Sequence, residues 1–148
     1  MKRKAAHYWL LKTEPKEWSW DDQSKNGGIS QWDGVKNRQA INNLKAMTVS
    51  DLCFFYHSGS GPTNRRVVGV VEVVKPWYEC EDGSGCAVDV KSVGELKKPV
   101  GLKEIKEMNG VNPRIVKEFA LVRQPRLSVA PVDREIWEKI FEMGGGCL

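Results

Sequence analysis

The chain has 148 residues, the usual size of one globular domain, and its 41% hydrophobic and 28% charged residues are typical of a folded soluble protein. Such a composition excludes an intrinsically disordered chain. The 23 basic and 19 acidic residues give a net charge of +4, which permits a polyanionic partner without requiring one. No long apolar run follows the basic residues at the start, so we expect neither a secretory signal nor a membrane span.

Few side chains of the types that bind zinc occur in the chain: the cysteines and histidines are Cys53, Cys80, Cys86, Cys147, His7 and His57. No C-x-x-C pair occurs and the two histidines are far apart in sequence, so the spacing does not predict a zinc site, and we expect no cofactor. Cys53 lies in an apolar run typical of a buried strand. A buried thiol suits a reducing compartment, and we therefore expect all four cysteines to be free.

The chain begins with a predicted basic tail, residues 1–6, followed by one domain over residues 7–148. The continuous apolar run 8–11 predicts a strand that is buried on both faces and ends before Pro15. An irregular stretch with a glycine-containing loop covers residues 18–28. The polar residues between this first strand and Pro15 therefore lie at the end of the strand, which is a common place for functional groups.

The middle of the chain predicts a helix and two strands. Apolar residues recur every three or four positions over 36–47, which indicates a helix. The run 52–56 predicts a second buried strand, and the run 67–74 a third one that ends at Pro76. Gly69 lies inside this third strand, where a glycine allows a bend or bulge.

The last part of the chain predicts three further strands and two helices. The strands cover 87–91, 119–122 and 127–129, and a short helix covers 102–108. Asp133 is expected to cap the final helix. Six short strands with helices between them indicate an α+β fold, a small mixed β-barrel of about six strands with the helices packed outside.

The aromatic residues give the strongest functional signal. The chain has six tryptophans, and Trp18, Trp20 and Trp32 fall in or beside predicted loops rather than at strand centres. A base stacked on such a ring contributes about 1–3 kcal/mol, and small polar groups such as Thr13 and Ser58 could hydrogen-bond its edge. For any single tryptophan, packing in the core is the commoner role. The combination with adjacent polar residues favours binding.

Five blocks of the sequence, 8–15, 18–21, 32–37, 54–58 and 126–129, resemble the signature blocks of the EVE domain family in the PUA-like superfamily. Within that family the chain is similar to the thymocyte nuclear protein family. The resemblance covers nearly the whole chain in the right order. It implies a PUA-like barrel, related to the YTH readers of methylated RNA, and a pocket that binds a modified base. Modified cytosine in DNA is the expected ligand, and modified RNA is the alternative.

The resemblance also implies which residues surround the pocket. Carried onto this chain, its aromatic walls are Trp20, Trp32 and Tyr56, its polar side is Lys12, Thr13, Asn37, His57 and Ser58, and its rim is Arg126, Leu127 and Ser128. Basic residues near the same loops are candidates for phosphate contacts, against the default of a solvated surface charge: Lys36, Arg38, Arg65, Arg66 and Arg123.

Two other functions are open at this stage. A protein-interaction adaptor could use the same groove for a peptide, because an aromatic cage also binds a methylated lysine. A nucleic-acid-modifying enzyme is less favoured, since no H-x-E…P-C-x-x-C pattern and no nucleophile–base pair is present in the sequence. We therefore expect a non-enzymatic, monomeric protein that binds modified nucleic acid, DNA rather than RNA, and no membrane. The nucleus is the expected compartment, and the cytoplasm is the alternative.

Overall fold

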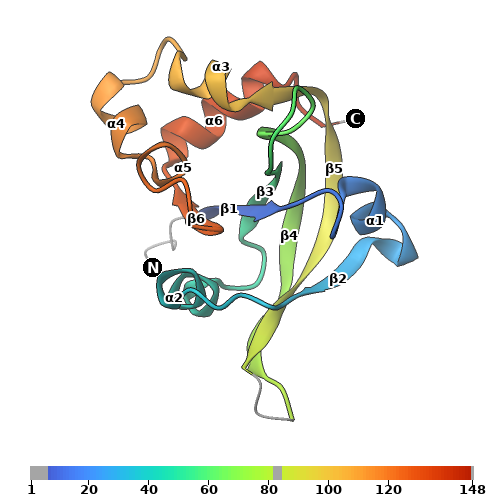
Figure 1. The fold of residues 1–148 in the computed structure, drawn as a ribbon. Coiled ribbons are helices and arrows are strands. Elements are labelled where there is room, and N and C mark those ends of the chain that lie inside the picture. Colours follow the sequence, from blue (N-terminus) through green and yellow to red (C-terminus); the bar gives the residue numbers. More distant parts are fainter. Residues whose placement is uncertain (1–6, 82–84, 148) are drawn as a thin grey trace, which may run out of the picture.

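A computed structural model describes residues 7–81 and 85–147, which form one six-stranded sheet with helices on both faces (Figure 1). The strand order is β2-β5-β4-β3-β1-β6, and β1 and β3 are parallel while the other neighbours are antiparallel. The strands are β1 Tyr8–Thr13, β2 Ile29–Trp32, β3 Leu52–His57, β4 Arg66–Glu79, β5 Cys86–Gly101 and β6 Val129–Val132. The predicted basic tail, residues 1–6, lies outside the described residues.

The helices divide between the two faces of the sheet. They are α1 Trp20–Ser24, the 3-10 turn η1 Asn26–Gly28, α2 Arg38–Ala46, α3 Leu102–Lys106, α4 Pro113–Glu118, α5 Ala120–Arg123 and α6 Arg134–Met143. In Figure 1, α3 to α6 gather at one end of the view, whereas α1 and α2 lie apart from them. Among the described residues, no helix is long and apolar enough to cross a membrane.

Alternating side chains along the central strands bury both faces of the sheet. In β1, Leu11 enters the core beneath α1 and α2, whereas Leu10 enters the core beneath α3 to α6. In β3, Phe55 enters the core beneath α1 and α2, and Phe54 enters the core beneath α3 to α6. The continuous apolar runs that predicted these two strands follow directly from this two-sided burial.

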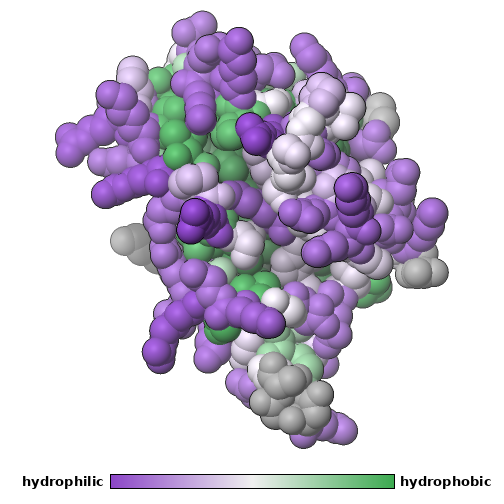
Figure 2. All heavy atoms as spheres, viewed as in Figure 1, coloured by the Kyte–Doolittle hydropathy of each residue, from purple (hydrophilic) through white to green (hydrophobic). Residues whose placement is uncertain are grey.

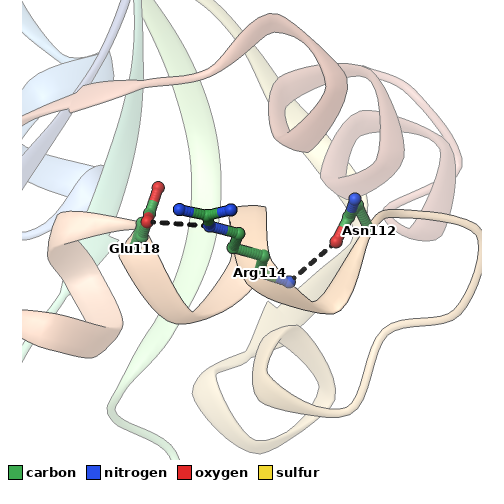
Figure 3. A network of polar contacts seen from close by, with 3 residues as sticks. All are labelled: Asn112, Arg114 and Glu118. Carbon is green, nitrogen blue, oxygen red and sulfur yellow. Dashed lines mark hydrogen bonds and ion pairs between the residues drawn. The ribbon is translucent and has the colours of Figure 1, made fainter.

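Side-chain caps fix where several helices begin. The Oδ1 atom of Asn112 accepts the backbone N–H of Arg114 at 2.9 Å, and Pro113 occupies the first turn of α4 (Figure 3). Along the same helix, Arg114 Nε lies 3.5 Å from Glu118 Oε1 on the exposed side. Asp133 caps α6, as predicted, by accepting the N–H of Glu135 at 2.9 Å. These local bonds set the direction of the helical layer above the sheet.

The α+β class with six strands is confirmed, but a closed barrel is not. The edge strands β2 and β6 are not neighbours in the hydrogen-bonded order of the described chain, so the sheet is open. The irregularity expected at Gly69 is confirmed, because the pairing register of β4 shifts there against both neighbours. A Cβ atom on Gly69 would lie 2.5 Å from the ring of Trp20, so only glycine leaves room for this close contact.

Two strand predictions were wrong. Residues 119–122 belong to α5 and the residue that precedes it, because a four-residue apolar run cannot by itself distinguish a strand from a buried helical turn. β4 does not end at Pro76 but continues to Glu79. The register of its pairing with β5 shifts between Lys75 and Tyr78, and at such an irregularity the missing proline N–H costs no ladder bond.

The cysteine prediction was also wrong in part. Cys80 and Cys86 form a disulfide, with their Cα atoms 5.2 Å apart, across the turn that joins β4 to β5. Cys53 is the buried thiol that the sequence predicted, and Cys147 is free and half-buried. The antiparallel pairing of Glu79 with Cys86 brings the neighbouring Cys80 to bonding distance of Cys86, and the spacing in the sequence did not predict this pairing.

Candidate functional site

A cavity of about 940 Å³ opens on the face of the sheet that carries α1 and α2, a volume within the usual range for ligand sites. Its walls come from the end of β1, the loop that follows it, the edge strand β2, the segment after β2, and the segment that leads into β6. The lining residues are Lys12, Thr13, Glu14, Glu17, Trp18, Ile29, Ser30, Gln31, Trp32, Asp33, Gly34, Val35, Lys36, Ser58, Pro125, Arg126 and Ser128.

Two tryptophans supply the aromatic part of this wall. Trp32, at the end of β2, packs edge-on against Phe55 with ring centroids 5.6 Å apart, so most of its ring is fixed in the core. Trp18, in the loop after β1, is half-buried, and its Nε1–H donates to Gln23 Oε1 at 2.9 Å. Both rings are therefore held in place before any ligand binds.

The Gln23 side chain of α1 organises one side of the cavity. It is fully buried, and its Oε1 atom accepts from both Trp18 and the hydroxyl of Ser30, while its Nε2 donates to the carbonyl of Gly28 at 2.8 Å. A buried amide with three hydrogen bonds is rigid, because loosening it would leave polar atoms without partners. Gln23 thus positions two lining residues without being part of the wall.

Lys12 lies at the opposite side and links β1 to the segment before β6. Its Nζ donates to the Pro125 carbonyl at 2.9 Å and lies 5.9 Å from the centre of the Tyr56 ring. Burial lowers the pKa of the Lys12 ammonium from its ordinary value, since it loses part of its hydration. The ammonium still has further N–H donors to offer a ligand.

Of the residues predicted to surround the pocket, six line this cavity: Lys12, Thr13, Trp32, Ser58, Arg126 and Ser128. The Thr13 hydroxyl donates to the backbone carbonyl of Trp18 at 3.0 Å, so a ligand would meet mainly its acceptor side. Asn37 and Leu127 line a smaller cavity next to it, which shares Pro125 and Arg126 with the first.

The cavity lining does not include three of the predicted pocket residues, Trp20, Tyr56 and His57. Trp20 is buried and packs edge-on against Phe55, at a centroid distance of 5.3 Å. Its backbone N–H donates to Nε2 of His57 at 3.0 Å. Burial, and then the nearby positive charge of Arg66, lower the pKa of His57, which keeps the imidazole neutral and able to accept this bond. These residues support the site from the core side.

Tyr56 belongs to the core on the other face of the sheet. It is buried among the residues beneath α3 to α6, and burial raises the pKa of its phenol to about 12. Its side chain alternates with that of Phe55 along β3, and Phe55 points to the cavity face. Its ring therefore meets the cavity only indirectly, through the Lys12 ammonium.

The predicted phosphate-binding residues are dispersed. Lys36 lines the cavity, and Arg38 and Arg123 are exposed at the ends of α2 and α5. Arg65 is exposed, has a positive φ of 59°, and donates through Nε to the carbonyl of Gly59 at 3.0 Å. Arg66 is half-buried, and its Nε has no partner among the residues that the structure describes. Of these five residues, Lys36 alone lines the cavity.

Ten lining residues were not predicted: Glu14, Glu17, Trp18, Ile29, Ser30, Gln31, Asp33, Gly34, Val35 and Pro125. Several belong to the sequence blocks quoted above or directly adjoin them, so a block-by-block assignment could have included them. Ile29 and Ser30 of β2 carry no comparable signal, because their role comes from an edge position that only the sheet order defines. Within residues 7–81 and 85–147, no group of three potential metal ligands comes together.

The family model that describes the EVE domain matches residues 7–143. The chain belongs to the EVE domain family. This confirms the resemblance on which the pocket residues were assigned. Mouse thymocyte nuclear protein 1 is 29% identical over an alignment that covers 93% of this chain and 74% of the mouse protein.

Solved structures agree with this membership. A protein from Agrobacterium tumefaciens is 40% identical, with a TM-score of 0.83, and the match covers 95% of this chain and 94% of that one. Human THYN1, in complex with DNA containing 5-methylcytosine, is 26% identical with a TM-score of 0.81, covering 94% and 98%. A YTH domain from Zygosaccharomyces rouxii, at 16% identity and a TM-score of 0.62, shares the fold alone.

Proposed function

We propose that this EVE domain binds nucleic acid carrying a modified base and holds that base in the 940 Å³ cavity. The observation that carries the proposal is the lining itself, in which two fixed tryptophan rings adjoin groups that donate and accept hydrogen bonds. The similarity to human THYN1, a structure of which contains 5-methylcytosine DNA, favours modified cytosine in DNA. Modified RNA is the alternative ligand of the same cavity.

The polar lining suits a cytosine edge. Carboxylates accept from the exocyclic amino group of cytosine, and Glu14, Glu17 and Asp33 are available in the lining. The Lys12 ammonium and the hydroxyls of Ser58 and Ser128 supply donors for the carbonyl edge of the ring. A base held between aromatic faces and these groups gains both stacking and hydrogen bonds.

A base must leave its stack to enter the cavity, which costs a few kcal/mol in a duplex and least at an unpaired position. Phosphate contacts from Lys36 and Arg126 in the lining, with Arg38 and Arg123 beyond it, offset this cost. Burial of one methyl group contributes about 0.8 kcal/mol, or roughly fourfold in affinity. We therefore expect a moderate preference for a methylated over a plain base.

The decisive experiment is a titration of the protein with short DNA and RNA strands that carry cytosine or its methylated and oxidised forms, at fixed low salt. We expect tighter binding to one modified base, and a loss of about 5- to 150-fold in Trp18→Ala, the contribution of one stacked base. The matched control is Trp77→Ala, which removes a half-exposed tryptophan outside the cavity and should leave the affinity unchanged.

Equal binding to modified and plain strands in all contexts would overturn the proposal. The strands recovered after titration should have unchanged mass, since we propose binding without chemical change. Methylated peptides in the same titration test the adaptor alternative. Hydrophilic residues cover much of the face shown in Figure 2, with apolar patches between them.

We propose the nucleus as the cellular compartment. The name of the mouse and human relatives favours the nucleus, whereas similar structures also come from bacteria. A nuclear, monomeric protein remains our prediction from the sequence. Fluorescent tagging in a eukaryotic cell and light scattering of the purified chain would test the two parts separately.

A further inference from the structure

A second cavity, of about 370 Å³, lies beside the first. It is lined by residues at the start of α2 and in the segment between α5 and β6, namely Asn37, Gln39, Gln124, Pro125, Arg126 and Leu127. Because Pro125 and Arg126 belong to both linings, the two cavities share a wall. The hydrogen bond from Lys12 to the Pro125 carbonyl ties this wall to β1.

The chemistry of the second cavity differs from that of the first. Three of its six residues carry side-chain carboxamides and one a guanidinium, whereas the first cavity contains the carboxylates Glu14, Glu17 and Asp33. Gln39 and Gln124 are exposed, so their amides are accessible to a ligand.

The Asn37 side chain contributes a directed donor. Its Oδ1 atom already accepts the N–H of Ala40 at 3.0 Å, as the cap of α2, which leaves its Nδ2 group to donate. The cap also fixes the orientation of this side chain. The apolar side of the same cavity comes from Pro125 and the buried Leu127.

We propose that this second cavity binds the base that neighbours the modified base in the same strand, and that it prefers a purine. The inference rests on the proposed function. Carboxamides pair in a bidentate way with N6 and N7 of adenine, and their N–H groups can also donate to O6 and N7 of guanine. Arg126, in the shared wall, lies where the phosphodiester between the two bases would pass. The protein thus recognises a modified base together with its sequence context.

The test uses DNA strands in which 5-methylcytosine is fixed and each flanking position is varied in turn among the four bases and an abasic site. On one side of the methylated base, we expect the change from a purine to an abasic site to weaken binding by about 5- to 150-fold, the contribution of one bidentate pair. The double variant Gln39→Ala/Gln124→Ala should discriminate among these strands much less than the unmodified protein, since only the amide of Asn37 remains, and it should still prefer the methylated base. Asn42→Ala, an exposed amide on the same helix outside both cavities, should behave like the unmodified protein.

Two outcomes would overturn the inference while leaving the proposed function intact. One is a preference for the methylated base that does not depend on either neighbour. The other is a neighbour effect that is as large in the double variant as in the unmodified protein. Absence of any preference for the methylated base would instead contradict the proposed function. Circular dichroism of the double variant separates these results from misfolding.

Discussion

The two faces of the sheet are built differently. Beneath α3 to α6 the core is closed by aromatic stacking, in which Trp137 stacks with both Tyr8 and Phe54 at centroid distances of 4.6 and 3.7 Å. On the other face, α1 and α2 leave room for the cavity, whose wall is positioned partly by the buried amide of Gln23. The same strands supply both faces, so stability and binding can be altered separately by changing neighbouring side chains.

This separation depends on the two-residue period of the strands. A shift of one residue in β1 would exchange Leu10 with Leu11 and move side chains of the closed core toward the cavity. The parallel register of β1 with β3, in which Leu10 is opposite Phe54, fixes the assignment. Changes confined to one face should therefore have effects confined to that face.

The largest effect is expected from Trp137→Ala on the closed face. Removing this buried indole should lower the free energy of unfolding by about 3–5 kcal/mol, through lost burial and the cavity left behind. Binding by the protein that remains folded should not change. Urea unfolding and titration at low temperature measure the two quantities. A loss of affinity as large as in Trp18→Ala would show that the faces are not independent.

A smaller effect on both quantities is expected from Gln23→Met on the cavity face. The substitution keeps the approximate volume but leaves Trp18, Ser30 and Gly28 without their shared partner. We expect the free energy of unfolding to fall by about 1–3 kcal/mol, and the affinity to fall because the Trp18 ring is released. Ser24→Ala, an exposed change on α1, serves as the control. Unchanged affinity in the Gln23 variant would mean that Trp18 needs no positioning.

The smallest effect concerns pH. The folded protein holds the pKa of His57 below its ordinary value, by burial first and the charge of Arg66 second, against the opposing charge of Asp21. As the pH falls below about 6.5, His57 binds a proton in the unfolded chain before it does so in the folded protein. The free energy of unfolding therefore has its full value above the unfolded-state pKa of His57, and it decreases as the pH falls from there to the folded-state pKa.

His57→Gln tests this prediction, because it keeps an acceptor for the N–H of Trp20 and cannot titrate. Its stability should depend less on pH between 7 and about 5 than that of the unmodified protein, as measured by urea unfolding at each pH. An identical pH dependence in the two proteins would assign the effect to other groups.

The sequence predicted the elements whose signal is local. Apolar runs located β1 and β3, and the cap Asp133 located the start of α6. The helical nature of residues 119–122 was missed, because those side chains are divided between the two cores: Ala120 enters one, and Phe119 and Leu121 the other. Such a division depends on tertiary packing rather than on periodicity.

The lining of the cavity was predicted in part, since some of its members also depend on tertiary packing. Residues at the end of β1 and before β6 were assigned to the pocket and line the cavity, but Trp20 was assigned where Trp18 lies. The two tryptophans are separated by one residue at the start of a helix. The contact of Trp20 with Gly69, 49 positions away, decides which ring is buried. No local pattern encodes that contact.

The cavity is built from widely separated segments: its walls lie within residues 12–36, at Ser58 and within 125–128. Strands β3, β4 and β5 are consecutive in sequence and pair as short-range hairpins. The pairing of β1 with β6 closes a loop of more than 100 residues and can form only after β6 has been synthesised. A nascent chain would therefore acquire its stable sheet before it acquires a ligand site. Because a bound ligand would hold both ends of this fold together, it should slow global unfolding rather than protect a single loop.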